Sequence, residues 1–266
     1  MESGTLNLDI QGTAIDLAYR RRPGPLPTLL CLHGFGSTKE DYVDLTMREE
    51  FRGRDLVFWD TPGFGLSSIS NPEALSIPFL VAVAQSACSA LGLERFHLSG
   101  HSMGGLTALM LAEAEPDKVL SFFDIEGNVA PEDCFLSRQI IDYPAETADD
   151  FLAGFKERVG QRSEFSSALY VTALDCKVQP TSVAPIFRSM VDLSDNTNLM
   201  EIMAKLRCPR AFVYGAQNRH LSYLERLPDI GVEVIEIAES GHFPMYSNPP
   251  ALWRAMAGFI SRHEAQ

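Results

Sequence analysis

The sequence has no hydrophobic run long enough to cross a membrane, and it has few positive charges. No segment reaches the roughly 18 consecutive apolar residues that a membrane span needs, and residues 1–4 carry no signal-peptide pattern. Its 35 acidic residues outnumber 22 basic ones, and a net charge of -13 opposes binding to phosphate backbones and anionic lipids. We therefore expect a cytoplasmic protein without nucleic-acid or membrane partners.

Cysteine is also scarce, and the spacing of the cysteines argues against a small fold held together by zinc or by disulfides. The five cysteines, Cys31, Cys88, Cys134, Cys176 and Cys208, form no C-x-x-C pair, so neither a zinc knuckle nor a disulfide framework is indicated. We expect no metal and no cofactor. Hydrophobic residues make up 45% of the 266 residues, which is enough for one large domain with a buried core.

Buried strands and amphipathic helices alternate along most of the chain. Residues 6–19 read as an antiparallel hairpin, and continuous apolar runs typical of strands buried on both faces follow at 28–32, 56–59, 96–99, 119–125, 211–214 and 232–237. Helical spacing of apolar residues marks 77–91, 104–114 and 250–260. This alternation predicts an α/β fold with a mostly parallel sheet wrapped by helices.

Residues 128–207 interrupt the alternation with several helix-like pieces and no clear buried strand. Long insertions between core elements usually serve as lids or binding elements. We therefore expect a core formed by residues 1–127 and 208–266, with a mainly helical cap inserted at 128–207. The alternative is a decorated crossover without a role at the site.

The segment Gly100-His101-Ser102-Met103-Gly104 lies between an expected strand and an expected helix. This context fits the G-x-S-x-G nucleophile elbow, in which a tight turn exposes the serine hydroxyl above the sheet. Glycines allow so sharp a turn because they lack a side chain. The pattern predicts Ser102 as a nucleophile, against the alternative of a small-residue turn with a chance serine.

An earlier loop, His33-Gly34-Phe35-Gly36, follows another buried strand. It could place the Phe35 backbone N–H beside that of Met103, and two such donors form an oxyanion hole for a tetrahedral intermediate. We predict these two N–H groups as the oxyanion hole.

His242 lies in a loop after the last apolar run, at the expected edge of the sheet. A serine hydroxyl needs such a neighbour to accept its proton, because almost no alkoxide exists near neutral pH. We predict His242 as the general base. The other histidines, His33, His97, His101, His220 and His263, favour structural or surface positions.

The chain resembles the α/β-hydrolase superfamily over nearly its whole length. The resemblance rests on four motifs in the expected order: residues 33–36, Asp60-Thr61-Pro62-Gly63-Phe64-Gly65-Leu66-Ser67, the Ser102 elbow, and Ser240-Gly241-His242. These motifs are specific for the fold and much less so for the substrate, because one scaffold hosts many chemistries.

The resemblance leaves the triad acid in an unusual place. Most members carry an aspartate where this chain has Asn218, and a neutral amide cannot stabilise an imidazolium. Some relatives instead place the acid at the end of the strand after the nucleophile helix, where this chain has Glu126, with Asp124 two residues deeper. We assign the acid to Glu126, while Asp124, an acid from elsewhere, or a Ser-His dyad without an acid remain alternatives.

A serine at the elbow suits acyl transfer, whereas relatives that attack carbon use an aspartate there. We expect hydrolysis of an ester or related acyl bond in a small to medium apolar substrate, by way of an acyl-enzyme. Apolar residues of 128–207 are candidates to line the pocket: Phe135, Phe151, Phe155, Phe165, Leu169, Phe187 and Met190. A carbon–carbon bond hydrolase, a thioesterase and a receptor-like ligand-binding relative are alternatives, and a homodimer is left open.

Overall fold

A single sheet organises the molecule, as the computed structural model describes it for residues 1–264. Its strands are β1 (Glu2–Ile10), β2 (Thr13–Arg22), β3 (Leu26–Leu32), β4 (Arg54–Trp59), β5 (Ser68–Ile69), β6 (Phe96–His101), β7 (Val119–Ile125), β8 (Arg210–Gly215) and β9 (Glu233–Ile237). Their order is β1-β2-β4-β3-β6-β7-β8-β9, with β5 paired to β2. From β4 to β9 neighbouring strands are parallel.

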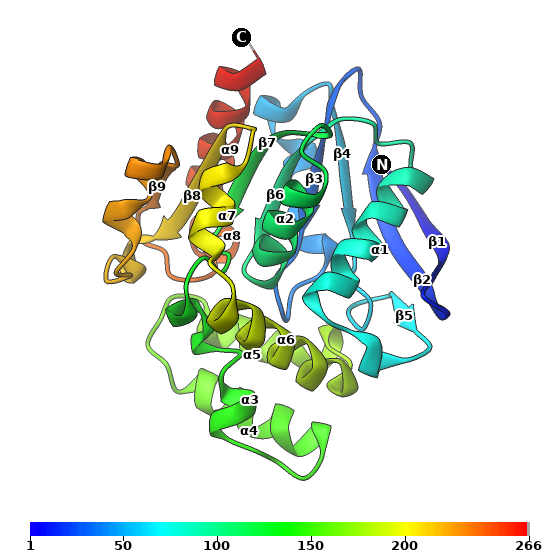
Figure 1. The fold of residues 1–266 in the computed structure, drawn as a ribbon, viewed down its shortest axis with the longest axis vertical. Helices are drawn as coiled ribbons and strands as arrows, with labels where there is room; N and C mark the ends of the chain where they lie inside the picture. The colour runs from blue at the N-terminus through cyan, green and yellow to red at the C-terminus, as the bar shows by residue number, and fades with distance from the viewer. Residues whose placement is uncertain (265–266) are drawn as a thin grey trace.

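Helices cover both faces of this sheet. The core helices are α1 (Ile77–Ala90), α2 (Met103–Ala114), α7 (Leu199–Lys205), α8 (Pro244–Ser247) and α9 (Pro249–Glu264). Figure 1 shows α1, α2 and α7 in front of the sheet, while α9 packs behind it against β7 and β9. The expected mostly parallel sheet with flanking helices is confirmed.

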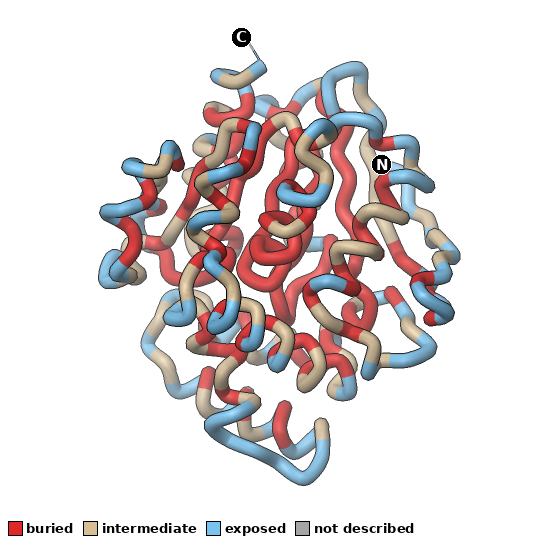
Figure 2. The backbone as a smooth tube through the Cα atoms, viewed as in Figure 1, coloured by how far each residue is buried: buried red, intermediate tan, exposed pale blue. Residues whose placement is uncertain are grey.

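The inner strands are buried along their whole length, which explains their continuous apolar sequences. Every residue of β4 and β6 is buried, and Figure 2 shows the central strands as the most buried part of the backbone. Edge strand β1 alternates exposed and partly buried residues instead, because one face of its hairpin with β2 meets solvent.

The chain between β7 and β8 forms helices and contributes no strand to the sheet. It contains α3 (Gln139–Asp142), α4 (Ala148–Gly160), α5 (Ser167–Lys177) and α6 (Val183–Asn196), followed by α7. Figure 1 shows α3–α6 together beyond one end of the sheet. They cover the loops after β3 and β4, since Phe187 of α6 contacts Phe35 and Val178 pairs with Phe64.

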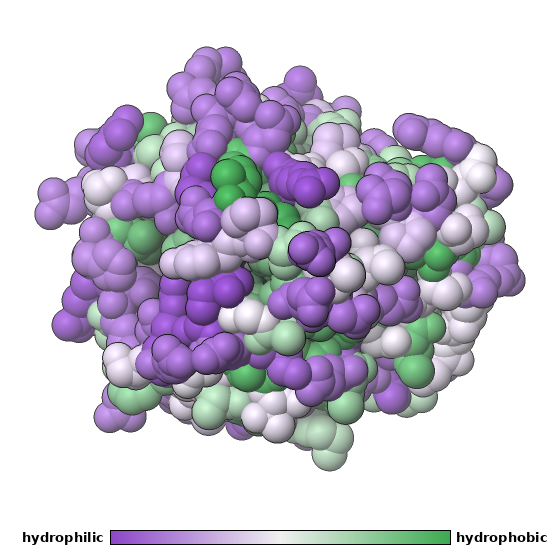
Figure 3. Space-filling model, turned by 90° about the horizontal axis from the view of Figure 1, so that it is seen from below, coloured by the Kyte–Doolittle hydropathy of each residue, from purple (hydrophilic) through white to green (hydrophobic). Residues whose placement is uncertain are grey.

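The surface at this end of the molecule is mostly polar. Figure 3 looks onto it and shows hydrophilic residues with scattered apolar ones between them. Within residues 1–264, none of the helices combines the length and the apolar character needed to traverse a bilayer.

Candidate functional site

Ser102 and Glu126 occupy matching positions at the carboxyl ends of neighbouring parallel strands. Each directly follows its strand, β6 or β7, and each has a left-handed backbone, with φ of 51° and 48°. The Ser102 N–H donates to the Ile125 carbonyl at 3.0 Å, and the Glu126 N–H donates to the Val213 carbonyl at 2.9 Å. The strand ladder therefore holds two residues whose φ values are uncommon for non-glycine residues.

Glycine makes the turn at Ser102 sterically feasible. A Cβ on Gly100 would lie 2.2 Å from the Gly104 carbonyl oxygen, and one on Gly104 would lie 2.4 Å from the Leu32 carbonyl oxygen. Both distances are far below van der Waals contact, so backbone packs directly on backbone here. This packing places Ser102 at the N-terminus of α2.

Ser102, His242 and Glu126 form a continuous hydrogen-bonded chain. His242 Nε2 lies 3.0 Å from Ser102 Oγ, and His242 Nδ1 lies 2.7 Å from Glu126 Oε2. The three residues are only 9%, 7% and 5% exposed. The carboxylate fixes the tautomer with hydrogen on Nδ1, which leaves Nε2 free to accept the serine proton.

Glu126 has two further partners that hold its carboxylate in place. Oε1 accepts from the Gly215 N–H at 2.7 Å, and Oε2 accepts from Asn218 Nδ2 at 2.7 Å. Asn218 therefore donates a hydrogen bond to the carboxylate that contacts His242. Its amide has a positioning role that the sequence reading, which treated Asn218 only as a missing acid, did not foresee.

Asp124, the alternative acid, is turned away from His242. It is fully buried, and its Oδ1 accepts from the Gly127 N–H at 3.0 Å. Among residues 1–264 its Oδ2 has no hydrogen-bond partner, and burial raises its pKa well above the usual range. The structure thus brings Glu126, and not Asp124, to the histidine.

Two other histidines shape the loops around the site. His33 Nε2 accepts from the Thr61 N–H at 2.8 Å, so its Nδ1 carries the hydrogen and donates to the Gly34 carbonyl. His101 Nε2 lies 2.7 Å from the His242 carbonyl oxygen. Burial lowers the pKa of both side chains, so they act as neutral hydrogen-bonding groups that fix the backbone.

The backbone donors predicted for an oxyanion hole lie in the loop after β3 and at the first residue of α2. Among the hydrogen bonds of residues 1–264, neither the Phe35 N–H nor the Met103 N–H has an acceptor. Gly34 permits the close approach of this loop, because a Cβ there would lie 2.4 Å from His101 Nδ1. Both N–H groups are therefore free to bind a ligand oxygen.

Aromatic side chains fill the space next to Phe35. Its ring centroid lies 4.3 Å from that of Phe187 and 5.9 Å from that of Phe155, and Phe151 stacks on Phe155. These rings are almost completely buried. Of the other apolar candidates, Met190 is buried, whereas Phe165 and Leu169 are 47% and 57% exposed.

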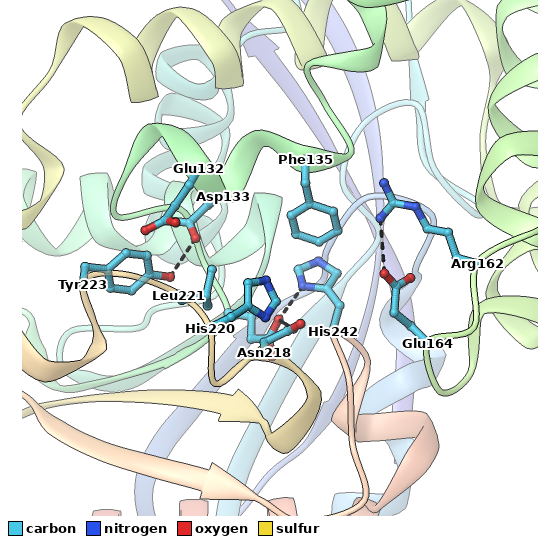
Figure 4. Close-up of a pocket in the computed structure, with 11 residues that line it drawn as sticks. Glu132, Asp133, Phe135, Arg162, Glu164, Asn218, His220, Leu221, Tyr223 and His242 are labelled. Atoms are coloured by element: carbon cyan, nitrogen blue, oxygen red, sulfur yellow. Dashed lines mark hydrogen bonds and ion pairs between the residues drawn. The ribbon is translucent and has the colours of Figure 1, made fainter.

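A pocket of about 310 Å³ adjoins the histidine. Figure 4 shows Phe135 next to the His242 ring, with Tyr223 and Asp133 on one side and Arg162 and Glu164 on the other. Phe135 is edge-on to His242, with ring centroids 5.0 Å apart. Ser102 does not line this pocket.

Sequence reasoning named Phe135 for this region but missed His220 and Tyr223. Both belong to the loop between β8 and β9, and they reach the pocket only because this loop folds beside His242. No spacing rule points to them. Throughout residues 1–264, no group of three or more His, Cys, Asp or Glu side chains is arranged to hold a metal ion.

A model of the alpha/beta hydrolase fold family matches residues 27–198. A pimeloyl-[acyl-carrier protein] methyl ester esterase from Aeromonas hydrophila is 32% identical over 136 residues, which cover 51% of this chain and 49% of that protein. The match thus spans about half the length of this relative. A monoacylglycerol lipase from Rattus norvegicus is 24% identical over 92% of this chain and 78% of its own length.

Solved structures agree in fold at low sequence identity. A carboxylesterase from Nitrososphaera gargenis superimposes with a TM-score of 0.76 over 98% of this chain and 99% of its own, at 14% identity. An N-acyl homoserine lactonase superimposes with a TM-score of 0.75 at 16% identity, covering 99% and 98% of the two chains. At these identities the likeness concerns the fold alone.

Proposed function

The chain belongs to the α/β-hydrolase family, and we propose that it is a serine hydrolase that cleaves ester bonds through an acyl-enzyme. The observation that carries this proposal is the buried hydrogen-bonded chain from Ser102 through His242 to Glu126. Its order of nucleophile, base and acid is that of a catalytic triad. The esterase and lipase among its relatives support the choice of an ester bond.

In the acylation step, Ser102 Oγ attacks the carbonyl carbon of the ester while its proton passes to His242 Nε2, 3.0 Å away. The tetrahedral intermediate then collapses as the bond to the leaving alcohol breaks, and His242 returns the proton to the alcohol oxygen. Glu126 stabilises the imidazolium that exists between these two transfers.

Deacylation repeats the sequence with water in place of serine. His242 takes a proton from the water as its oxygen attacks the acyl carbon, and it then protonates Ser102 Oγ as the carboxylic acid leaves. In both halves the Phe35 and Met103 N–H groups bind the oxyanion. Backbone donors in a site closed to water stabilise the developing charge strongly.

The helical segment 128–207, apart from core helix α7, acts as a cap in this proposal. Phe187 and Phe155 lie against Phe35, whose N–H belongs to the oxyanion hole. An acyl chain attached to Ser102 therefore meets aromatic side chains, which suits a small or medium apolar acyl group. These rings pack on one another in the structure. The acyl chain therefore binds between them only after they move apart.

Turnover of p-nitrophenyl butyrate tests the nucleophile. Ser102→Ala should lower kcat by at least ~1000-fold, because only the oxyanion hole and binding remain. Ser99→Ala is the matched control, since Ser99 is a buried serine of β6, the strand that Ser102 follows, and its hydroxyl has no hydrogen-bond partner in the described chain. A phosphonate ester should label wild type at Ser102, as read by peptide mass. Equal turnover in wild type and Ser102→Ala would overturn the proposal.

A further inference from the structure

The pocket beside His242 shares the catalytic histidine but not the nucleophile. His242 and Glu126 are part of its wall, whereas Ser102, Phe35 and Met103 are not. The acyl group of a substrate stays attached to the serine, while the leaving alcohol must take a proton from His242. Of the triad, this cavity contacts the histidine and the acid but not the serine, so it is placed for the alcohol part of an ester, which does not stay on Ser102.

The dimensions and walls of this pocket suit a small organic group. Its volume of about 310 Å³ lies at the lower end of the range for ligand sites. Phe135, Leu221 and Tyr223 supply apolar surface around the histidine. This wall differs from the region next to Phe35, which is closed by packed aromatic rings.

The remaining wall is rich in carboxylates. Glu132, Asp133 and Glu164 line it together with one guanidinium, that of Arg162. Arg162 Nη1 lies 3.6 Å from Glu164 Oε1, so the net charge of this pair is close to zero. Within residues 1–264, neither Glu132 nor Asp133 has a salt-bridge partner.

The two unpaired carboxylates are held in place by neutral donors. Glu132 Oε1 accepts from the Ser222 N–H at 3.0 Å and from its hydroxyl at 2.6 Å. Asp133 Oδ1 accepts from the Tyr223 hydroxyl at 2.7 Å. Figure 4 shows both acids on the same side of His242. Their hydrogen bonds fix both carboxyl groups in the wall, and among residues 1–264 the charge of Glu132 has no cationic partner.

We propose that this pocket binds the leaving alcohol of the substrate and selects it by charge, favouring a cationic alcohol over a neutral one and excluding an anionic one. The inference rests on the proposed ester hydrolysis, since it assigns the alcohol part of that substrate. A cation gains attraction from Glu132 and from the aromatic rings of the wall. An anionic alcohol is repelled by the negative charge of Glu132, and this repulsion is only partly screened because the pocket is only partly open to water.

Three butyrate esters with leaving groups of similar size isolate this charge effect. Butyrylcholine is cationic, 3,3-dimethylbutyl butyrate is its neutral isostere, and 3-sulfopropyl butyrate is anionic. We expect kcat/KM of wild type to fall in that order, by about tenfold or more between cation and anion. Equal values for the three esters would overturn the inference.

Glu132→Gln should lower the ratio of kcat/KM for butyrylcholine to that for its neutral isostere by about threefold to tenfold. Glu164→Gln should lower it as well, because it leaves Arg162 without its partner. Glu225→Gln is the control, since Glu225 is exposed on the neighbouring segment and does not line the pocket. If Glu132→Gln changes the ratio no more than Glu225→Gln does, the charge selection is wrong.

Binding to the Ser102→Ala variant separates this inference from the proposed function. Nuclear magnetic resonance titration with choline and with 3,3-dimethylbutanol reads the pocket without turnover. Tighter binding of choline, reduced by an added Glu132→Gln, supports the pocket even if wild type hydrolyses none of the three esters. Equal binding of the two alcohols contradicts it, even where Ser102→Ala has abolished hydrolysis as the proposed function requires.

Discussion

Glu126 is the residue on which the geometry of the site depends most. Its carboxylate accepts three hydrogen bonds, from Gly215, Asn218 and His242, each at 2.7 Å. Gly215 is the last residue of β8, Asn218 follows that strand, and His242 follows β9. One side chain at the end of β7 therefore ties three strand ends together and orients the histidine.

Replacing this carboxylate tests its role as the triad acid. Glu126→Gln keeps the size of the side chain but removes the charge that stabilises the imidazolium, so kcat for p-nitrophenyl butyrate should fall about 100- to 10,000-fold. Asp124→Asn, two residues away, should stay within about threefold of wild type, because Asp124 makes no contact with His242 and burial raises its pKa. Near-wild-type kcat in Glu126→Gln on a folded protein would contradict the assignment.

Asn218 provides a second test at the residue scale. Its Nδ2 and His242 Nδ1 both lie 2.7 Å from Glu126 Oε2. Asn218 and the histidine therefore share one acceptor atom and lie close together. Adding Asn218→Asp to Glu126→Gln should restore at least about tenfold of the lost kcat, since a carboxylate returns close to Nδ1. Failure of the double variant to exceed Glu126→Gln would mean that position 218 cannot replace the acid.

The sequence was enough to predict that Ser102, His242 and Glu126 lie together, because local spacing and strand order place such residues at one edge of a parallel sheet. The hydrogen bond from Asn218 to Glu126 was out of reach. It joins residues 92 positions apart, and its existence depends on the path of the loop after β8. The position of Tyr223 was not predictable for the same reason, since it also depends on the path of this loop. Its hydroxyl donates a hydrogen bond to Asp133 in the pocket.

At the scale of elements, the segment between β7 and β8 makes hydrogen bonds of two different kinds with the core on the two sides of the site. Lys177 and Gln179 make backbone hydrogen bonds with Gly65 and Gly63 at 2.9 and 3.0 Å. On the other side of the site, Phe165 N–H donates to the Gln217 side chain at 2.8 Å. The first attachment is made by the backbone, whereas the second depends on one exposed side chain.

The aromatic contact between this segment and the oxyanion loop predicts how acyl chain length is limited. Phe187→Ala removes the ring that lies 4.3 Å from Phe35, so longer acyl chains should gain room. We expect the ratio of kcat/KM for p-nitrophenyl octanoate to that for the butyrate to rise several-fold. The free energy of unfolding should fall by about 3–5 kcal/mol, because the cavity also costs stability.

Phe259→Ala is the matched control for this prediction. Phe259 is fully buried on α9 and packs against Phe123, behind the sheet. Its loss should lower the free energy of unfolding to a similar extent without changing the chain-length ratio. The prediction fails if both variants alter the ratio equally, since the effect would then reflect general destabilisation.

The boundaries of the elements were predictable where burial was continuous. The apolar run at 119–125 coincides with β7 (Val119–Ile125), because β7 lies inside the sheet. The run at 232–237 begins one residue before β9 (Glu233–Ile237), an edge strand with partly exposed residues. The helices of 128–207 had no separate boundaries in the sequence reading, since their packing on the core depends on contacts distant in sequence.

At the scale of the whole molecule, the acidic residues lie not only on the surface, since some of their carboxyl groups are buried. Asp124 is fully buried, and burial raises the pKa of Asp133 to about 7 from its usual 3.8. A raised carboxyl pKa means that the folded protein binds a proton that the unfolded chain has already lost. The stability that this proton provides is complete below about pH 4 and disappears as the pH rises toward 7.

The contribution of Asp133 to the free energy of unfolding should therefore decrease between pH 5 and pH 7. For Asp133 alone the decrease is about 2 kcal/mol, because each pKa unit corresponds to about 1.4 kcal/mol. Asp133→Asn removes the titrating group, so the free energy of unfolding of the variant relative to wild type should rise by about 2 kcal/mol from pH 5 to pH 7. Urea unfolding of both proteins at pH 5 and pH 7 measures this difference, independently of any loss of stability common to both pH values. An identical change in the two proteins would mean that Asp133 is already ionised at pH 5, and its charge would then act fully on any alcohol bound beside His242.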